Sequence, residues 1–582
     1  MTNSSLPASA PLQRRAFWRR PQGSLFTWLA PASVGLVLAL LVLPPIAVLI
    51  KTSLTEAQTG AYTIAHFRDL FADPQFYTAT WNSLLFSGLS TALSILFGTT
   101  VAWVVVRTNA PWRGLAYVTA AVSLGTPYIL HVMAWLFFLG RSGPVNELYR
   151  AFASTGDNLF DVFSMSGMVL IQGMLWSPLV FLLLAATFER SNAEWEEAAR
   201  MCGASIARTM WSISFRQAWP AITGMALFVF IRNLESFDVP VLVGGPGRVY
   251  LLTTDIYLST TEMPPKMGRA SAFSVILIAV LSAALFCYNR YSANADRYAS
   301  VTGKGYRPRP FDLGRHKWLG TAVVVLNFLF VLGLPLLVSL WLSLMPFARP
   351  FALAALPFAT LENFQQVLAD RHLIGLGINT LVVAAEAATI AMLIAAVAGW
   401  LVVRHQAGAR LIEVLSSIPI VFPGIVVGVA LILIALNLPI PLYGSLTLIM
   451  LAFLIRFLPY AMRYAHTGVL QIHRELEEAA GASGAGPFTV FRRIVVPLLV
   501  PALVSGWVFI FLLGANELSM SILLAGANSQ VMPVAIYDRW SSGQNVEVFA
   551  LGLVWTAFMS VLMLVLYLTG RRFLAALRPA NL

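Results

Sequence analysis

The sequence predicts an all-α protein that crosses a membrane many times, and three observations support this. Hydrophobic residues make up 58% of the 582-residue chain and charged residues only 11%, whereas a soluble domain carries about 25% charged residues. Apolar runs of about 20 residues, long enough to cross a bilayer, recur along the chain. One polar, helix-forming segment occurs twice between such runs. We therefore predict a polytopic membrane protein with two homologous halves.

Each half is expected to contain six membrane spans, which makes about 12 transmembrane helices in all. The apolar runs assigned as spans in the first half are 27–50, 81–106, 115–139, 166–188, 221–244 and 270–289. Those in the second half are 318–344, 377–403, 411–436, 443–465, 500–525 and 547–570. The third run is interrupted in both halves, at Gly125 and Pro127 and again at Pro423 and Gly424. Such breaks are tolerated where neighbouring helices satisfy the freed backbone groups.

Polar stretches divide the chain into four parts: a cytosolic N-terminal tail (1–25), a first transmembrane domain (26–290), a cytosolic linker (291–317) and a second transmembrane domain (318–582). With both termini in the cytosol, most of the 38 Lys and Arg residues fall on the inner side, as the positive-inside rule requires. The net charge of +12 is therefore assigned to membrane orientation and not to nucleic-acid binding. The linker is rich in Arg, Gly, Pro and Ser, as a tether would be.

The repeated segment is the most informative part of the chain. Residues 194–222 read EWEEAARMCGASIARTMWSISFRQAWPAI, and residues 475–503 read ELEEAAGASGAGPFTVFRRIVVPLLVPAL. The two align without a gap, in one constant register over their whole length. In each copy an alanine pair leaves a helix surface with little side-chain bulk, and a glycine permits a bend with positive φ. We predict a cytosolic helix–turn–helix, twice, before the fifth span of each half.

A second match indicates how the halves are related. Asn82-Ser83 and Asn379-Thr380 each open the second span of their half. Because the repeated segments also occupy the same place in both halves, the repeats have parallel topology.

The pattern of EAA, three residues, Gly, and a later apolar-x-apolar-Pro run resembles the coupling loop of bacterial binding-protein-dependent ABC importer permeases. The second copy follows it through Pro497, whereas the first has Arg216 at the proline position. Two copies in one chain resemble the fused permeases of the ferric-iron importer family, which implies a type I ABC permease fold. The positions that match the ATPase-coupling loops are Glu197, Ala198, Ala199, Gly203, Glu478, Ala479, Ala480 and Gly484.

The resemblance also implies partners and a substrate. We expect a multi-pass protein of the bacterial inner membrane, surrounded by lipid, with two copies of a cytosolic ABC ATPase and a periplasmic solute-binding protein. Ferric iron is the expected solute, with 2-aminoethylphosphonate, thiamine or a polyamine as alternatives. A more distant alternative is a secondary transporter of the major facilitator type. The loops where that family carries its acidic-basic motif read RTNAPWRG and RHQAGARL and lack it.

The sequence contains no feature that predicts an enzyme. The glycine-rich stretch at 302–305 lacks the upstream Gly and the following Ser/Thr of a P-loop. ATP is therefore expected on the partner subunit, and no cofactor is expected on this chain. His131 has no companion at ligand spacing, so we predict no metal site.

Ionisable residues at bilayer depth are costly, and they usually face a bundle interior or a water-filled path. Glu235, Asp238, Asn516 and Glu517 form a possible translocation pathway. The alternative is structural pairing, for example of Arg232 with Glu235 or Asp238. We favour pairing for Arg232 and Arg456. For Glu235 and Glu517 both roles remain open.

Overall fold

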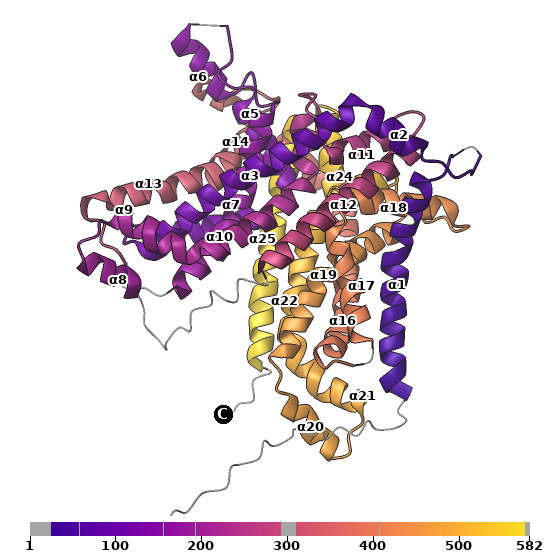
Figure 1. The fold of residues 1–582 in the computed structure, drawn as a ribbon. Coiled ribbons are helices and arrows are strands. Elements are labelled where there is room, and N and C mark those ends of the chain that lie inside the picture. The colour runs from indigo at the N-terminus through magenta and orange to yellow at the C-terminus, as the bar shows by residue number, and fades with distance from the viewer. Residues whose placement is uncertain are drawn as a thin grey trace, which may run out of the picture.

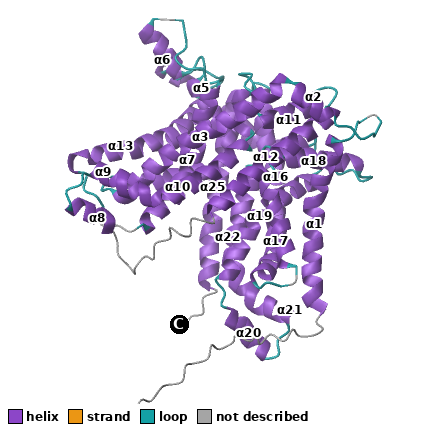
Figure 2. Cartoon of the chain, viewed as in Figure 1, coloured by secondary structure: helices purple, strands orange, loops and turns teal. Residues whose placement is uncertain are grey.

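The computed structural model describes residues 25–576 except 58, 155, 192–193, 293–309 and 407. The predicted N-terminal tail, apart from Leu25, and most of the predicted linker therefore lie outside the described residues. Within the described part of the chain, the regular structure is entirely helical, as the sequence predicts (Figure 2). The helices form two bundles that meet at one end and diverge towards the other (Figure 1).

The first half begins with a long helix and ends with another. Its helices are α1 (Leu25–Ser53), α2 (Ala65–Ala72), α3 (Pro74–Arg107), α4 (Arg113–Gly125), α5 (Tyr128–Leu139), α6 (Pro144–Ala153), α7 (Met165–Arg190), α8 (Glu194–Met201), α9 (Ile206–Thr209), α10 (Phe215–Leu234), α11 (Leu252–Thr261) and α12 (Met267–Ser292). A π-helical turn, η1 (Met210–Ser214), joins α9 to α10, and a second, η2 (Pro240–Gly244), follows α10.

The second half, as far as the structure describes it, repeats this order without a counterpart of α6. Its helices are α13 (Lys317–Phe328), α14 (Leu334–Ser343), α15 (Glu362–Ala369), α16 (Arg371–Val403), α17 (Ala409–Ser417), α18 (Gly424–Asn437), α19 (Leu446–Leu470), α20 (Arg474–Ala482), α21 (Pro487–Val490), α22 (Val496–Ala515), α23 (Ser521–Leu524), α24 (Met532–Ser541) and α25 (Asn545–Ala576). Short turns join several of them: η4 (Gly314–His316), η5 (Leu329–Gly333), η6 (Leu353–Phe358), η7 (Ile418–Val421) and η8 (Phe491–Val495).

The number of described helices that are long and apolar enough to cross a membrane is close to the 12 expected. Among the described residues, nine helices are long and apolar enough, and two bent pairs raise the number to at most eleven. The bent pairs are the interrupted third spans: the chain turns by 107° between α4 and α5 and by 106° between the α17 and α18 segments. Pro127 and Pro423 precede the second helix of each pair, a position where a backbone N–H would have no partner within the helix, so the missing N–H of proline costs no hydrogen bond.

The fifth spans end earlier than predicted. The expected runs 221–244 and 500–525 each join a helix to the irregular segment after it, because α10 stops at Leu234 and α22 at Ala515. Polar residues follow at once, beginning with Glu235 in one half and Asn516 in the other. In the first half α10 also carries Arg232, and it is not among the nine apolar helices of the described chain.

The first helix of each half packs against the other half. Helix α1 lies against α12 and also against α16, α17 and α18, and Leu38 is fully buried in one cluster with Leu401 and Leu458. Helix α13 lies against α3 and α4 in return. A Cβ on Gly320 of α13 would come within 2.9 Å of the Ala110 Cβ, so this approach requires glycine. The two halves are thus interlocked by exchanged helices.

Candidate functional site: the repeated segments and a buried charge cluster

Both repeated segments (194–222 and 475–503) fold as the predicted helix–turn–helix. Helices α8 and α20 end at turns in which Gly203 and Gly484 have φ of +83° and +86°, so the prediction of positive-φ glycines is confirmed. In each turn the N–H of the residue after the glycine, Ala204 or Ala485, donates back to the carbonyl of Ala199 or Ala480 at 3.0 Å. The two turns lie at the diverging ends of the two bundles (Figure 1).

The EAA positions lie at the surface of these segments. Ala198, Ala479 and Glu478 are exposed, and Glu197, Ala199 and Ala480 are partly exposed. Glu478 forms an ion pair with Arg474 of its own helix, at 3.1 Å. Two large apolar side chains, Trp195 and Leu476, are exposed at the same position of the two copies. The surface is therefore accessible to a partner and partly apolar.

The acidic residue before each EAA triplet is buried, which the sequence analysis did not predict. The Arg107 Nε lies 3.6 Å from the Glu196 Oε1, and the Arg404 Nη2 lies 2.6 Å from the Glu477 Oε1. Each pair joins a repeated segment to the end of the second span, α3 or α16. The signal was available, because Glu196 and Glu477 occupy the same position of the two copies. Arg107 and Arg404 likewise recur at the spacing of Asn82 and Asn379.

The two anchoring pairs differ in their remaining hydrogen bonds. Ser214 Oγ donates to Glu196 Oε1 at 2.7 Å, whereas the Trp400 indole donates to Glu477 Oε2 at 3.0 Å. Burial raises the pKa of Glu196, and the nearby Arg107 opposes that rise. Within the described structure, the Arg107 Nε and Nη1 atoms are buried without a hydrogen-bond partner.

The end of the predicted linker packs against the first repeated segment. Phe311 donates from its N–H to the Arg107 carbonyl at 2.7 Å, and its carbonyl accepts from the Asn109 N–H at 3.0 Å. Its ring stacks on Trp103 with centroids 6.1 Å apart, and the Arg200 guanidinium of α8 lies 5.5 Å from the ring centroid. In the second half, Phe491 of the segment itself contacts Trp400, the equivalent of Trp103. The described end of the linker is therefore docked and not a free tether.

The polar residues after α10 form an ion-pair cluster that crosses the two halves. Glu235 is buried and accepts from Arg232 through Oε1. Its other oxygen, Oε2, accepts from the Arg456 Nη2 of α19 at 2.8 Å. The predicted pairing of Arg232 with Glu235 is confirmed. Arg456 is also paired, and its partner comes from the other half, which the sequence did not indicate.

Two of the other predicted pathway residues, Asp238 and Glu517, lie near this cluster. Asp238 interacts electrostatically with Glu517, and so does Arg232. Glu517 accepts from the Ser519 N–H at 3.1 Å. The Asp238 Oδ1 and Asn516 Oδ1 atoms are buried without a hydrogen-bond partner among the described residues. Glu235, Asp238 and Glu517 thus meet around one polar centre after the two fifth spans, and Asn516 directly precedes Glu517 in the chain.

The break in each of the two bent helix pairs, α4–α5 and α17–α18, lies near this polar centre. Tyr128, the first residue of α5, interacts with Arg232, Asp238 and Glu517. A Cβ on Gly424, the first residue of α18, would lie 3.1 Å from the Glu517 Oε1. The helix breaks therefore bring backbone and side chains from both halves to one buried location, where irregular backbone is tolerated only if it is enclosed by protein or lines a cavity.

Among the described residues, no three His, Cys, Asp or Glu side chains are grouped so that they could hold a metal ion. His131 is buried in α5 beside a small gap against η5 and α14, and its Nε2 has no hydrogen-bond partner in the described part of the chain. The residues around that gap are not those of the charge cluster.

Comparison with known proteins matches two parts of the chain, residues 94–297 and 387–580, to the family described as binding-protein-dependent transport system inner membrane component. The chain is 27% identical to the ferric transport system permease protein FbpB of Actinobacillus pleuropneumoniae over 83% of this chain and 70% of that protein. It is 21% identical to the Fe(3+)-transport system permease protein FbpB 2 of Haemophilus influenzae over 66% of this chain and 72% of that protein. It is 29% identical to the putrescine transport system permease protein PotI of Escherichia coli over 30% of this chain and 63% of that protein.

Proposed function

We propose a specific transport role for this chain, which belongs to the family of binding-protein-dependent transport system inner membrane components. It is a multi-pass permease with both halves of the permease pair in one polypeptide. The proposed solute is ferric iron, on the support of the two ferric-transport relatives. Membership of this family leaves the major-facilitator alternative without support.

The observation that carries the coupling role is the pair of exposed repeated segments, each tied to a second span by a buried ion pair. A force applied to α8 or α20 is transmitted through Arg107 to α3 or through Arg404 to α16. Two equivalent segments suit two copies of one cytosolic ABC ATPase, which binds and hydrolyses ATP. We therefore assign Glu197, Ala198, Ala199, Gly203, Glu478, Ala479, Ala480 and Gly484 to the ATPase interface.

The same assignment sets the orientation. The repeated segments and both termini face the cytosol, and a periplasmic solute-binding protein delivers the solute to the opposite side. When the two ATPases close, the segments approach each other and the bundles rock between outward and inward access about the central cluster. Glu235, Asp238, Asn516 and Glu517 line this route, because they follow the fifth spans of the two halves and Glu235 is buried where Arg456 of the other half reaches it.

Coupling is tested in the complete importer reconstituted in vesicles, with ATP hydrolysis and uptake measured on the same sample. Glu478→Lys reverses an exposed charge at the proposed interface, and deletion of Gly484 removes the bend. Both variants are expected to uncouple ATP hydrolysis from uptake. Glu362→Lys, an exposed acid on α15, serves as the control. Normal transport by both variants would show that the segments do not couple.

The solute is tested with radiolabelled ferric iron delivered on the cognate periplasmic solute-binding protein. Saturable, ATP-dependent uptake is expected. Putrescine is the second candidate, because the putrescine permease PotI matches 30% of this chain. Uptake of labelled putrescine with no uptake of iron would replace the ferric assignment and leave the permease role intact.

A further inference from the structure

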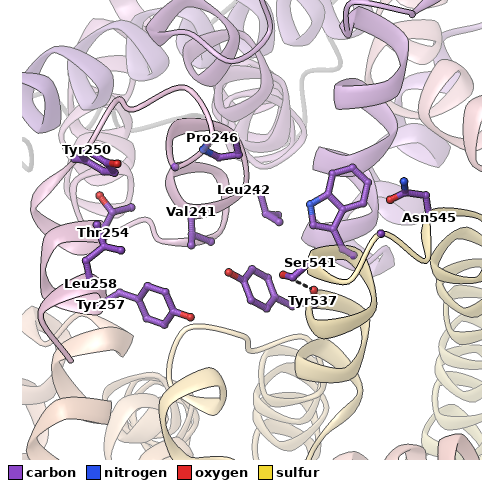
Figure 3. Close-up of a pocket in the computed structure, with 13 residues that line it drawn as sticks. Val241, Leu242, Pro246, Tyr250, Thr254, Tyr257, Leu258, Tyr537, Ser541 and Asn545 are labelled. Carbon is purple, nitrogen blue, oxygen red and sulfur yellow. Dashed lines mark hydrogen bonds between the residues drawn. The ribbon is translucent and has the colours of Figure 1, made fainter. Parts of the chain in front are cut away.

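A cavity of about 570 Å³ lies between the two halves, away from the repeated segments. Its walls come from η2, α11 and the loop between them in the first half and from α24 in the second (Figure 3). Helices α11 and α24 occupy equivalent places in the two halves, and Tyr257 and Tyr537 hold the same position along them. Their phenol groups point toward each other across the cavity and interact (Figure 3). The cavity therefore lies where the two halves meet symmetrically.

The cavity is on the side of the molecule opposite to the proposed ATPase interface. The Asn82 amide of α3 donates to the Tyr250 carbonyl, and the Asn379 amide of α16 donates to the Gln530 carbonyl, both at 3.2 Å. These residues lie near the start of α3 and α16, whereas Arg107 and Arg404 lie at their ends. A helix that runs from Asn82 to Arg107 is roughly 37 Å long. The cavity thus faces the side on which the solute arrives.

The walls are held in place by further contacts. The Leu252 N–H donates to Ser83 Oγ at 2.9 Å, and the Met532 N–H donates to Thr380 Oγ1 at 2.8 Å, so α11 and α24 are fixed to the second spans in the same way. One ring is fixed as well, because Tyr257 packs edge-on against Phe237 at 5.3 Å. The matched Asn-Ser and Asn-Thr pairs of the sequence repeat therefore have a structural role in forming this cavity.

The lining is uncharged and mostly apolar, with several polar side chains set among Val241, Leu242 and Leu258. Among the described residues it includes the side chains of Tyr250, Thr254, Tyr257, Tyr537, Trp540 and Asn545 and no Asp, Glu, Lys, Arg or His. The carboxylates on the same helices do not line the cavity: Asp255 Oδ1 accepts from Gln75 and Asp538 Oδ2 accepts from Gln530, both at 3.0 Å. A bare multivalent cation placed there would lose hydration without gaining a counter-charge, which is strongly unfavourable.

We propose that this cavity is an entry site for a ferric complex whose charge is neutralised by its own oxygen ligands, such as a hydroxycarboxylate chelate. The proposal rests on the ferric assignment made above. Hydroxyl, amide and indole groups can donate hydrogen bonds to such ligands, and aromatic faces can cover the apolar edges of a chelate. The volume falls within the range of about 300–1,000 Å³ that is common for small-molecule sites. The charge cluster is placed next on its route, since Asp238 directly precedes the segment Val239–Gly244, part of which lines the cavity.

The test is equilibrium binding of radiolabelled ferric citrate to the full chain in lipid nanodiscs. Tyr257→Phe with Tyr537→Phe keeps both rings and removes both hydroxyl groups, and it is expected to weaken binding about tenfold, as the loss of two hydrogen bonds predicts. Tyr537→Phe alone is expected to have a smaller effect in the same direction. Tyr77→Phe is the matched control, because Tyr77 is an exposed tyrosine of α3 that does not line the cavity.

Three results would overturn the proposal. The first is equal binding by the double variant. The second is binding of ferric ion without citrate together with a visible ferric–tyrosinate absorption band, which would show direct coordination by phenolate. The third is iron uptake by the complete importer that the double variant leaves unchanged. Absence of iron uptake by the wild-type importer would instead refute the ferric assignment, so the two failures are distinguishable.

Discussion

The two repeated segments share a sequence pattern but are held by different sets of contacts. In the second, Glu477 receives Arg404 at 2.6 Å and the Trp400 indole at 3.0 Å. In the first, Arg107 lies 3.6 Å from Glu196, and the Trp103 indole N–H, equivalent to that of Trp400, is buried without a hydrogen-bond partner among the residues described. The anchoring ion pair of the first segment is therefore longer than that of the second, and it lacks the additional hydrogen bond from a tryptophan.

The linker compensates for this difference. Phe311 covers Trp103 and reaches Arg200, a residue of the first segment, while the second segment supplies Phe491 from its own sequence. A chain that joins two permease halves can thus replace an internal contact of one half with a contact from its linker. The linker therefore helps to position the first segment and does not only connect the halves.

A similar contrast exists at the centre of the molecule. Glu235 of the first half is shared between Arg232 and Arg456, whereas Glu517 of the second half is bonded locally to Ser519. The first-half carboxylate therefore joins the halves, and the second-half carboxylate does not depend on the other half for its hydrogen bonds. Each contrast can be tested by paired substitutions.

The largest effect is expected for Glu235→Gln. Removing this charge leaves two arginines in the buried cluster without their carboxylate, and breaking a buried ion pair costs about 3–5 kcal/mol. We expect a lower melting temperature in detergent and loss of solute uptake. Glu517→Gln is the matched variant, with a cost of about 1 kcal/mol for altered local hydrogen bonds. Equal shifts in melting temperature for the two variants would contradict the conclusion that Glu235 joins the two halves and Glu517 does not.

The next effect is expected for Phe311→Ala. Truncation of a buried phenylalanine costs about 3–5 kcal/mol in a protein core, and we expect the lower end of that range for a contact made by a linker. Because the lost contacts surround Arg107 and Arg200, uptake per ATP hydrolysed should fall. Phe152→Ala, at an exposed phenylalanine of α6, is the control. Unchanged coupling in Phe311→Ala would show that the linker is only a tether.

A smaller effect, about 2 kcal/mol, is expected for Glu477→Gln, because hydrogen bonds to charged groups contribute about 1.5–3 kcal/mol. The adjacent exposed residue provides the control: Glu478→Gln should change the melting temperature little, since an exposed ion pair contributes about 0–1 kcal/mol. Glu477 thus tests how the segment is anchored to α16, and Glu478 tests how the segment binds the ATPase. A melting shift for Glu478→Gln as large as that for Glu477→Gln would contradict this division.

The sequence predicted the parts of this structure that depend on local pattern. Apolar run length predicted the long helices, and the gap-free alignment of the two copies predicted two equal helix–turn–helix segments with positive-φ glycines. The breaks at Pro127 and Pro423 were also visible. Partners distant in the chain were not: the exchange of α1 and α13 and the Arg456–Glu235 pair depend on how the halves pack. A long apolar run likewise does not show where a helix stops within it, as the ends of α10 and α22 demonstrate.

The burial of Glu196 and Glu477 was missed for a related reason. Both stand beside another glutamate in a polar segment, and the sequence pattern alone favours the surface for all of them. Only the tertiary position of Arg107 and Arg404 distinguishes the anchoring acid from the exposed one. A repeat comparison that paired recurring acids with recurring arginines could have identified them.

The smallest effect is expected for Glu196→Gln and depends on pH. Burial raises the pKa of Glu196 in the folded chain above that in the unfolded chain, and Arg107 only partly opposes this. Stability that depends on the protonated carboxyl is therefore present at acid pH and is lost as the pH rises through the folded pKa. Because glutamine does not titrate, the wild-type melting temperature relative to Glu196→Gln should fall between acid and neutral pH. Exposed Glu362→Gln supplies the background in the same buffers. If the melting temperature of the wild type instead rises relative to that of Glu196→Gln as the pH increases, the ion pair with Arg107 outweighs the effect of burial. The two repeated segments would then be held in the same way.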